Sequence, residues 1–370
     1  MTGKTLQAEI GIIGGGLAGL AAATLLIEAG RSVQVVEARD RPGGRIRSVL
    51  DDQGRHFADL GPSWIWPSVQ PTIARWIEKL GLSTFAQYQD GLVILDHGRE
   101  DTVERRPLPG QFGTMRLEGG PQALIDRLAT RIPRTAIRTG APVVSIDLSD
   151  KEVAIRTGGA SPDMLHVGQL IVAVPPRITL AGIDWQPGLP AALTQALAAL
   201  PTWMASQAKV AVIYDRAFWR ERGWSGRIFS RVGPLMEAHD HSGADGNPAA
   251  IYGFVGWPPD HRKAAAADLE THIRAQLSRC FGKDAPEPKA VHIEDWATDP
   301  LVATPRDLAE PMDHPQPGPA FLRAPQAADR LWFAGSETAA QSPGLIEGAL
   351  VAAEHAAAGI HSSKTDHPLN

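Results

Sequence analysis

The chain has 370 residues, of which 43% are hydrophobic, and its formal net charge is −5 at pH 7. This length exceeds one compact core, so we expect two lobes of an ordinary globular protein. An acidic balance without a basic tract argues against a nucleic-acid-binding protein. The single cysteine, Cys280, cannot form an intramolecular disulfide and favours a reducing compartment. We therefore expect a cytoplasmic protein in which Cys280 is buried in a helix.

The first apolar stretch allows three interpretations: a signal peptide or membrane span, a buried strand and helix, or a nucleotide site. A signal peptide needs a basic segment before its apolar run, whereas Glu9 stands there. A membrane span does not fit four glycines in its first half. Residues 8–13 therefore predict a buried strand, followed by a helix that ends at Gly30 and a second strand over residues 32–37.

The glycines between the first strand and the helix follow a spacing with a physical purpose. Gly14, Gly16 and Gly19 match G-x-G-x-x-G. Gly14 permits a tight turn, Gly16 lets a pyrophosphate approach the backbone, and Gly19 lets helix and strand pack closely. Glu37 ends the second strand, where it can accept hydrogen bonds from a ribose. Together with the positive end of the helix dipole, these features predict a dinucleotide site, without deciding between NAD and FAD.

The residues after Glu37 carry a resemblance to a known family. The segment RDRPGGRIRS contains Arg41, Gly43, Gly44 and Arg45. It is similar to the R-x-G-G-R segment of the flavin amine oxidases, the family of monoamine oxidase, polyamine oxidase and L-amino-acid oxidases. The resemblance extends over nearly the whole chain as separate motifs in the family order. It implies an FAD cofactor whose phosphates Arg45 reaches.

Further motifs of the resemblance imply further cofactor contacts. Residues 57–67 look like the segment that passes under the flavin ring, and residues 330–360 look like a second FAD signature. There, the start of a helix points at the flavin and favours its reduced form. The implied cofactor-binding residues are Gly14, Gly16, Gly19, Glu37, Arg39, Gly44, Arg45, Gly61, Pro62, Ser63, Val143, Ala173, Trp296, Gly335, Ser336, Glu337, Gly344, Leu345 and Ile346.

Lys209 lies in a segment of alternating apolar residues. As a strand, this segment places Lys209 on the same face as Ala211 and Ile213. A lysine among apolar neighbours is costly unless it has a partner or a lowered pKa. One interpretation is an edge-strand lysine whose tip reaches water. The resemblance instead makes Lys209 the catalytic residue, which holds a water near flavin N5.

The sequence departs from the family at three places. The two rings that flank the flavin in well-known members fall near Arg306 and on Leu345. Trp64 and Trp66, with Leu345, are therefore the candidates for the substrate walls. The cysteine that binds flavin covalently in some relatives is replaced by Pro305, so we expect non-covalent FAD. The C-terminal membrane helix of mitochondrial relatives is missing, so we expect a soluble protein without a membrane partner.

The predicted fold is α/β, with a Rossmann-like FAD-binding lobe interleaved with a smaller α+β substrate lobe. This is the amine oxidase form of the FAD fold related to glutathione reductase. We assign residues 1–80, 117–198 and 299–362 to the FAD lobe. Residues 81–116 and 199–298 form the substrate lobe, and residues 363–370 form a frayed tail.

The predicted activity is the two-electron oxidation of an amine. A hydride passes from the α-carbon to flavin N5, the imine hydrolyses, and O₂ is reduced to H₂O₂. The partners are a small amine and O₂, without a metal ion, and a homodimer is compatible with this prediction. Two alternatives stay open: a flavin desaturase or C–C oxidoreductase, as in protoporphyrinogen oxidase or the carotenoid desaturases, and a non-catalytic flavoprotein. The sequence does not select the amine.

Overall fold

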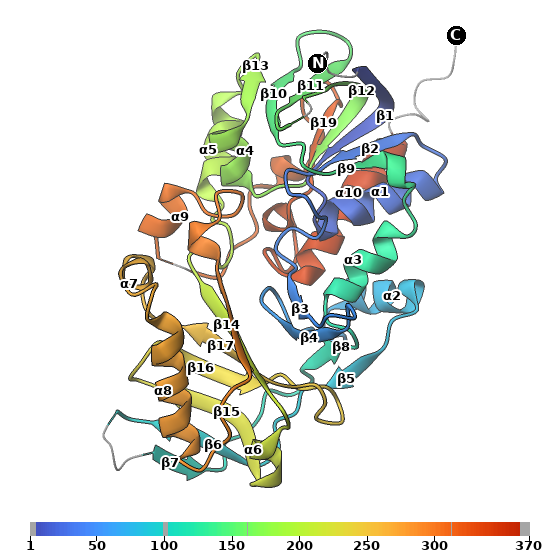
Figure 1. Ribbon diagram of the computed structural model, residues 1–370. Helices are drawn as coiled ribbons and strands as arrows, with labels where there is room; N and C mark the ends of the chain where they lie inside the picture. Colours follow the sequence, from blue (N-terminus) through green and yellow to red (C-terminus); the bar gives the residue numbers. More distant parts are fainter. Residues whose placement is uncertain (1–4, 99–102, 161, 312, 363–370) are drawn as a thin grey trace.

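The computed structural model describes residues 5–98, 103–160, 162–311 and 313–362, so the predicted tail, 363–370, lies outside the described residues. Two lobes lie one above the other in Figure 1, each built around its own sheet. We call them the upper lobe, with an eight-stranded sheet, and the lower lobe, with a seven-stranded sheet. The α/β fold class predicted from the sequence is confirmed.

The upper sheet has the strand order β13-β10-β11-β12-β1-β2-β9, with β19 beside β12. Its centre is parallel, because β1 lies between β2 and β12 and runs in the direction of both. β10 and β11 form an antiparallel hairpin. The strands are β1 (Thr5–Ile13), β2 (Val33–Val36), β9 (Ile137–Arg138), β10 (Val143–Asp147), β11 (Val153–Thr157), β12 (Met164–Val172), β13 (Asp184–Gln186) and β19 (Leu331–Phe333).

Helices pack on this sheet around an apolar core. α1 is buried from Leu17 to Thr24, which suits its nearly continuous apolar sequence. It ends where Gly30 adopts φ +77° and the Gly30 and Arg31 amides bond the last helical carbonyls. α1 packs against α10 from the other end of the chain. The upper-lobe helices are α1 (Leu17–Glu28), α2 (Pro71–Leu80), α3 (Gln122–Ala129), α4 (Pro176–Gly182), α5 (Ala191–Ala199), α9 (Pro305–Ala309) and α10 (Ile346–Ser362).

The lower sheet has the order β18-β14-β17-β16-β15-β6-β7. Its strands are β6 (Leu92–Asp96), β7 (Val103–Arg106), β14 (Ala208–Tyr214), β15 (Trp224–Ser230), β16 (Leu235–Asp240), β17 (Ala249–Val255) and β18 (Ala290–Asp295). Its helices are α6 (Phe218–Glu221), α7 (Pro259–Ala264) and α8 (Leu269–Phe281). α8 covers one face, and Cys280 is buried there as expected.

The other face of the lower sheet meets a two-stranded ribbon, β3 (Ser48–Leu50) with β4 (His56–Asp59). A second ribbon pairs β5 (Thr84–Ala86) with β8 (Met115–Leu117). β14 alternates as predicted: Val210 packs under α8, while Ala211 and Ile213 pack against the β4 region. Because β14 lies between β17 and β18, the interpretation of Lys209 as an edge-strand lysine is wrong. None of the described helices is long and apolar enough to cross a membrane.

The turn between β1 and α1 generates the first prediction. An added Cβ on Gly19 would lie 1.9 Å from the Gly14 carbonyl oxygen, whereas one on Gly16 would meet nothing within 4 Å. Gly16 also has φ −75°, which alanine adopts freely. We expect Gly19→Ala to lower the free energy of unfolding by about 1–3 kcal/mol because the backbone must shift. Gly16→Ala should leave it within about 0.5 kcal/mol. Urea unfolding of both variants checks this, and equal stability would contradict the packing role of Gly19.

Candidate cofactor and substrate site

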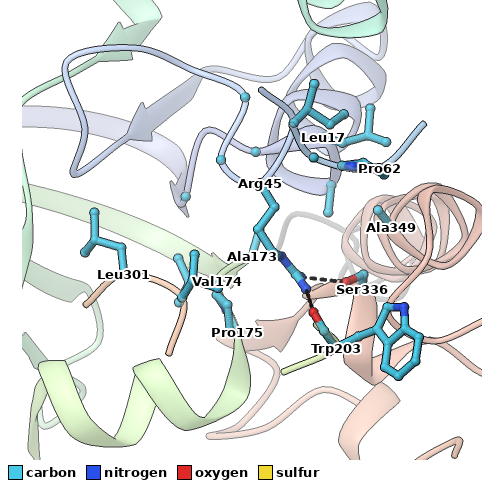
Figure 2. Close-up of a pocket in the computed structure, with 18 of the residues that line it drawn as sticks. Leu17, Arg45, Pro62, Ala173, Val174, Pro175, Trp203, Leu301, Ser336 and Ala349 are labelled. Carbon is cyan, nitrogen blue, oxygen red and sulfur yellow. Dashed lines mark hydrogen bonds between the residues drawn. The ribbon is translucent and has the colours of Figure 1, made fainter. Parts of the chain in front are cut away.

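A cavity of about 590 Å³ runs along the junction of the two lobes. Figure 2 shows part of its wall, with residues of the glycine turn, of the strand end at 173–175 and of α10 around it. The lower lobe adds side chains of β14 and β17. This volume lies in the range of cofactor and small-molecule sites.

Most residues that the sequence assigns to the cofactor meet at this cavity. Those lining it are Gly14, Gly16, Glu37, Arg39, Gly44, Arg45, Gly61, Pro62, Ser63, Val143, Ala173, Trp296, Ser336, Gly344, Leu345 and Ile346. Gly19, Gly335 and Glu337 are outside the lining. Gly19 supports the turn from behind, and Glu337 binds Arg45 instead.

Glu37 follows the end of β2 and is only 5% exposed. Its Oε2 accepts a hydrogen bond of 2.6 Å from the Gly15 amide, and its Oε1 accepts one of 2.9 Å from the Arg39 amide. A carboxylate offers about four acceptor sites, so two bonds leave capacity for a ligand. The acid predicted to bind ribose is therefore also the residue that fixes the glycine turn.

Arg45 joins the two predicted FAD signatures. Its Nη1 donates to Glu337 Oε1 at 2.6 Å. Its Nη2 donates to Ser336 Oγ at 2.9 Å, a bond that Figure 2 shows. The Glu337 side chain is fully buried, while that of Arg45 is 26% exposed toward the cavity. The pair thus holds the guanidinium at the wall, with the acid behind it.

Lys209 extends from β14 into the cavity and is 5% exposed. Its Nζ donates to the Gly61 carbonyl at 2.7 Å. The Tyr252 and Phe254 rings lie 5.7 and 5.6 Å from Nζ, a distance at which they favour a cation. Burial lowers the pKa of Lys209 to about 7; the charge of Asp59 opposes this shift, and that of Arg45 adds to it. The amine can therefore gain or lose a proton near neutral pH.

Side chains of the lower lobe contact three consecutive residues at the end of β4. We call these residues the 59–61 segment. His241 Nε2 lies 3.1 Å from both the amide nitrogen and Oδ2 of Asp59, and Trp296 Nε1 donates to the Leu60 carbonyl at 3.0 Å. The Gly61 carbonyl accepts from Lys209 and, at 2.9 Å, from the Tyr252 hydroxyl. The segment that the resemblance places under the flavin ring is thereby fixed by several side chains.

Aromatic side chains form the wall beside Lys209. Trp64 and Trp66, predicted as substrate walls, line the cavity and donate to Gln87 Oε1 at 2.8 Å and Thr114 Oγ1 at 3.1 Å. Leu345 also lines the cavity, whereas Arg306 lies on α9 and pairs with Glu310. Three further aromatic residues line the cavity that were not predicted from the sequence: Trp203, Tyr252 and Phe254. The spacing of the last two in AAIYGFV shows that they share a strand face, but only the pairing of β17 with β14 places them beside Lys209.

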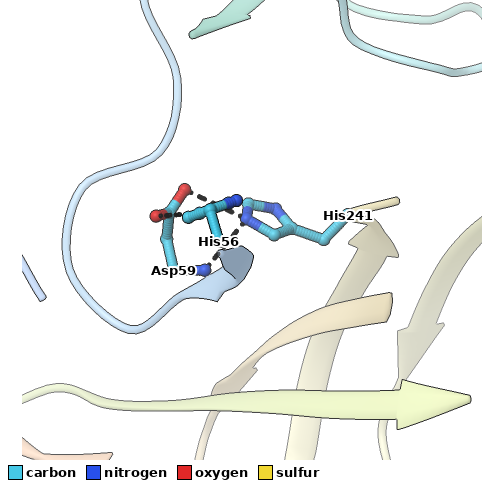
Figure 3. A group of neighbouring side chains, drawn as sticks. All are labelled: His56, Asp59 and His241. Carbon is cyan, nitrogen blue, oxygen red and sulfur yellow. Dashed lines mark hydrogen bonds and ion pairs between the residues drawn. The ribbon is translucent and has the colours of Figure 1, made fainter. Parts of the chain in front are cut away.

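The half-buried His56 and the buried Asp59 and His241 lie close together (Figure 3). One donor atom from each lies within 4.8 Å of the others, close enough to suggest a metal site. Their hydrogen bonds already occupy these atoms: His56 Nε2 lies 2.8 Å from Asp59 Oδ1, and His241 Nε2 lies 3.1 Å from Oδ2. Histidine metal ligands usually donate their second ring N–H, whereas Nδ1 of His241 is buried and has no hydrogen-bond partner among the described residues.

The electrostatics of the group favour a carboxylate held by hydrogen bonds. Burial, followed by the charge of Arg116, lowers the pKa of His241 to about 4, so this ring is neutral at pH 7. Burial opposes the charge of Asp59, but the hydrogen bonds with His241 and His56 outweigh it and hold the pKa of Asp59 well below its usual range. Asp59 is therefore a buried anion held by hydrogen bonds. The expectation of a chain without a metal ion stays a prediction.

The profile of a known family matches most of the chain. Residues 17–115 and 105–361 match the family described as flavin containing amine oxidoreductase. This chain belongs to that family. The predictions of a flavoprotein, an oxidoreductase and an amine oxidase are therefore confirmed.

Individual members of the amine oxidoreductase family cover nearly the whole chain. The probable flavin-containing monoamine oxidase A of Dictyostelium discoideum is 25% identical over 92% of this chain and 95% of its own length. The human flavin-containing amine oxidase B is also 25% identical, over 95% of this chain and 85% of its own.

Solved structures of amine oxidases share the fold. Putrescine oxidase bound to putrescine has a TM-score of 0.78 and 21% identity over 97% of this chain and 100% of its own. Cyclohexylamine oxidase of Brevibacterium oxydans has a TM-score of 0.80 and 20% identity over 97% and 99%. The arrangement of the two lobes is thus that of amine oxidases.

The Arg45–Glu337 pair of this amine oxidoreductase generates the second prediction. Arg45→Met leaves the fully buried Glu337 without its cation. We expect a loss of about 1–3 kcal/mol in the free energy of unfolding of the flavin-free protein. The double variant Arg45→Met/Glu337→Gln should recover most of this loss, because no buried charge is left unpaired. Arg75→Met, which breaks an exposed pair with Glu354, is the control and should change stability by less than about 1 kcal/mol. A double variant as unstable as the single one would refute this account.

Proposed function

We propose that this protein is an amine oxidase that binds FAD non-covalently and uses Lys209 as its catalytic residue. The observation that carries the proposal is the place of Lys209 in the cavity, on the carbonyl of the 59–61 segment. Two supporting observations concern the cofactor link. Pro305 starts α9 outside the cavity lining, and Cys280 is a buried residue of α8.

The residues present fit a dinucleotide. At Gly16 an added Cβ meets open space, so the cavity reaches the backbone at the start of α1, where a pyrophosphate needs close approach. Glu37 would bind the ribose hydroxyls and Arg45 the phosphates. Leu345 and Ile346 also line the cavity, at the start of α10. Because α10 runs for 17 residues, its N-terminus favours negative charge at that end.

When bound, FAD supplies the two-electron chemistry, taking a hydride from the amine and passing electrons to O₂. The protein's own residues position the amine and handle protons. Trp64, Tyr252 and Phe254 give the end of the cavity beside Lys209 aromatic walls, which suit the apolar body of an amine. Lys209, with a pKa of about 7, can hold a water molecule and exchange a proton during reoxidation or imine hydrolysis.

The relatives and structural neighbours described above are named as amine oxidases. They do not favour the two alternatives, a desaturase-type C–C oxidoreductase and a non-catalytic flavoprotein. We further propose that the enzyme works in the cytoplasm on a small amine with O₂ as acceptor. Putrescine and cyclohexylamine, named for the structural neighbours, are suitable first substrates.

The third prediction tests the proposed function. The purified protein should be yellow, acid should release all its FAD into the supernatant, and an amine panel should reveal H₂O₂ release from at least one amine. Flavin that stays in the acid precipitate would overturn the non-covalent link. A yellow protein that reduces its flavin with no amine would favour the alternatives.

The fourth prediction concerns Lys209. Lys209→Met keeps the length of the side chain and removes the amine, so FAD should stay bound while turnover falls by about 10²-fold or more. Stopped-flow separates the roles: slow return of the yellow colour in O₂ indicates reoxidation, and slow anaerobic reduction indicates substrate handling. Lys289→Met, which removes an exposed lysine paired with Asp215, is the control. Wild-type rates in both half-reactions of Lys209→Met would rule out a catalytic lysine.

A further inference from the structure

The Gly61 carbonyl carries two hydrogen bonds from the lower lobe. Lys209 Nζ donates at 2.7 Å from β14, and the Tyr252 hydroxyl donates at 2.9 Å from the neighbouring strand β17. A carbonyl oxygen has two lone pairs, so these donors fill it. Both donors line the cavity, and the Gly61 carbonyl is the hydrogen-bond partner that the structure records for Lys209.

The position of the Tyr252 hydroxyl is fixed by the packing of its ring. Tyr252 is 1% exposed, and its ring stacks on His241 at 5.0 Å and 28°. Trp64 and Phe254 contact it edge-on, at 5.7 and 5.2 Å. His241 is in turn held by Asp59, two residues before Gly61. The hydroxyl therefore has little freedom to leave the carbonyl.

We propose that Tyr252 is a positioning residue for Lys209: by sharing the Gly61 carbonyl, its hydroxyl limits how strongly the lysine is held there. Its catalytic consequence rests on the proposed function, but the geometry does not. Two donors on one acceptor compete for the same electron density, so each bond is weaker than it would be alone. A weaker bond to the carbonyl leaves Lys209 freer to serve a ligand in the cavity.

The sign of the effect follows from this competition. Without the hydroxyl, the Gly61 carbonyl binds Lys209 more strongly, and this bond favours the charged ammonium. The pKa of Lys209 should then rise. A stronger phenol donor should weaken the bond and lower that pKa.

Other charged groups around Lys209 stay the same in this comparison. Those on the packed elements and at the cavity wall are His56 and Asp59 on β4, His292, Glu294 and Asp295 on β18, His241 behind Tyr252, and Arg45 with Glu337. Glu294 pairs with Arg47, and Asp295 pairs with Arg262. A change confined to the Tyr252 hydroxyl leaves all of these groups in place.

The first test measures the proton affinity of Lys209 in the full chain without flavin. Brief labelling with acetic anhydride at a series of pH values, read by peptide mass spectrometry, gives the pKa of each lysine. Tyr252→Phe should raise that of Lys209 by about half a unit to one unit, relative to wild type. Tyr214→Phe, a change in the α8-side core of the same lobe, should not move it. An unchanged Lys209, or the same shift in both variants, would overturn the proposal.

A second test is designed to lower the pKa of Lys209 instead of raising it, and it keeps the Tyr252 hydroxyl in place. Replacing the chain's three tyrosines by 3-fluorotyrosine makes the phenols stronger donors and keeps their shape. The pKa of Lys209 should fall, and it should not fall in the fluorinated Tyr252→Phe protein. A fall in both proteins would contradict a role of Tyr252.

A third test, on the FAD-bound enzyme, connects the pKa shift of Lys209 with catalysis. The pH profile of the half-reaction that depends on Lys209 should shift upward in Tyr252→Phe by the same half to one unit, with FAD affinity unchanged. A labelling shift without amine oxidation would support the positioning role and refute the proposed function. Amine oxidation with an unshifted Lys209 would do the reverse.

Discussion

The attachment of the 59–61 segment to the lower lobe is the constraint on which the site depends. Lys209, Tyr252, His241 and Trp296 come from positions up to 237 residues away from Asp59 in the chain, yet all bond to these three residues. The segment leaves the ribbon β3–β4 and runs into the cavity wall at Pro62 and Ser63. The Leu60 and Gly61 carbonyls accept hydrogen bonds from lower-lobe side chains. These bonds join the segment to the lower lobe and hold Lys209 at the cavity.

Two sets of buried charges lie near this segment, and their surroundings differ. Arg45 and Glu337 form a pair at the upper-lobe wall, where a phosphate can take up the exposed side of the guanidinium. Asp59, by contrast, is surrounded by histidines behind the aromatic wall and does not line the cavity. It acts on Lys209 through space, since its charge opposes the loss of the lysine proton. The cavity thus has a wall with an arginine backed by a buried acid, and a wall with aromatic rings and one titratable amine.

Buried anions of this kind are costly unless hydrogen bonds replace the lost water. Glu37 meets this requirement with two backbone amides, Glu337 with Arg45 and Ser336, and Asp59 with two histidines and Ser48. Each acid therefore has a structural partner that is present before a ligand binds. The site is consequently organised in the flavin-free protein, and ligand binding need not pay for ordering these side chains.

Those parts of the site that depend on spacing along a short stretch of chain could be predicted from the sequence. The G-x-G-x-x-G turn, the acid at the end of β2 and the start of α10 are fixed by short-range geometry, and they appear at the cavity as expected. Only the tertiary structure decided which long-range partners these elements meet. The Arg45–Glu337 pair spans 292 residues and the Asp59–His241 contact spans 182. Tyr252 and Phe254 read as ordinary apolar strand residues until β17 pairs with β14. Sequence periodicity gives the face of a strand, but which strands become neighbours depends on packing over the whole chain.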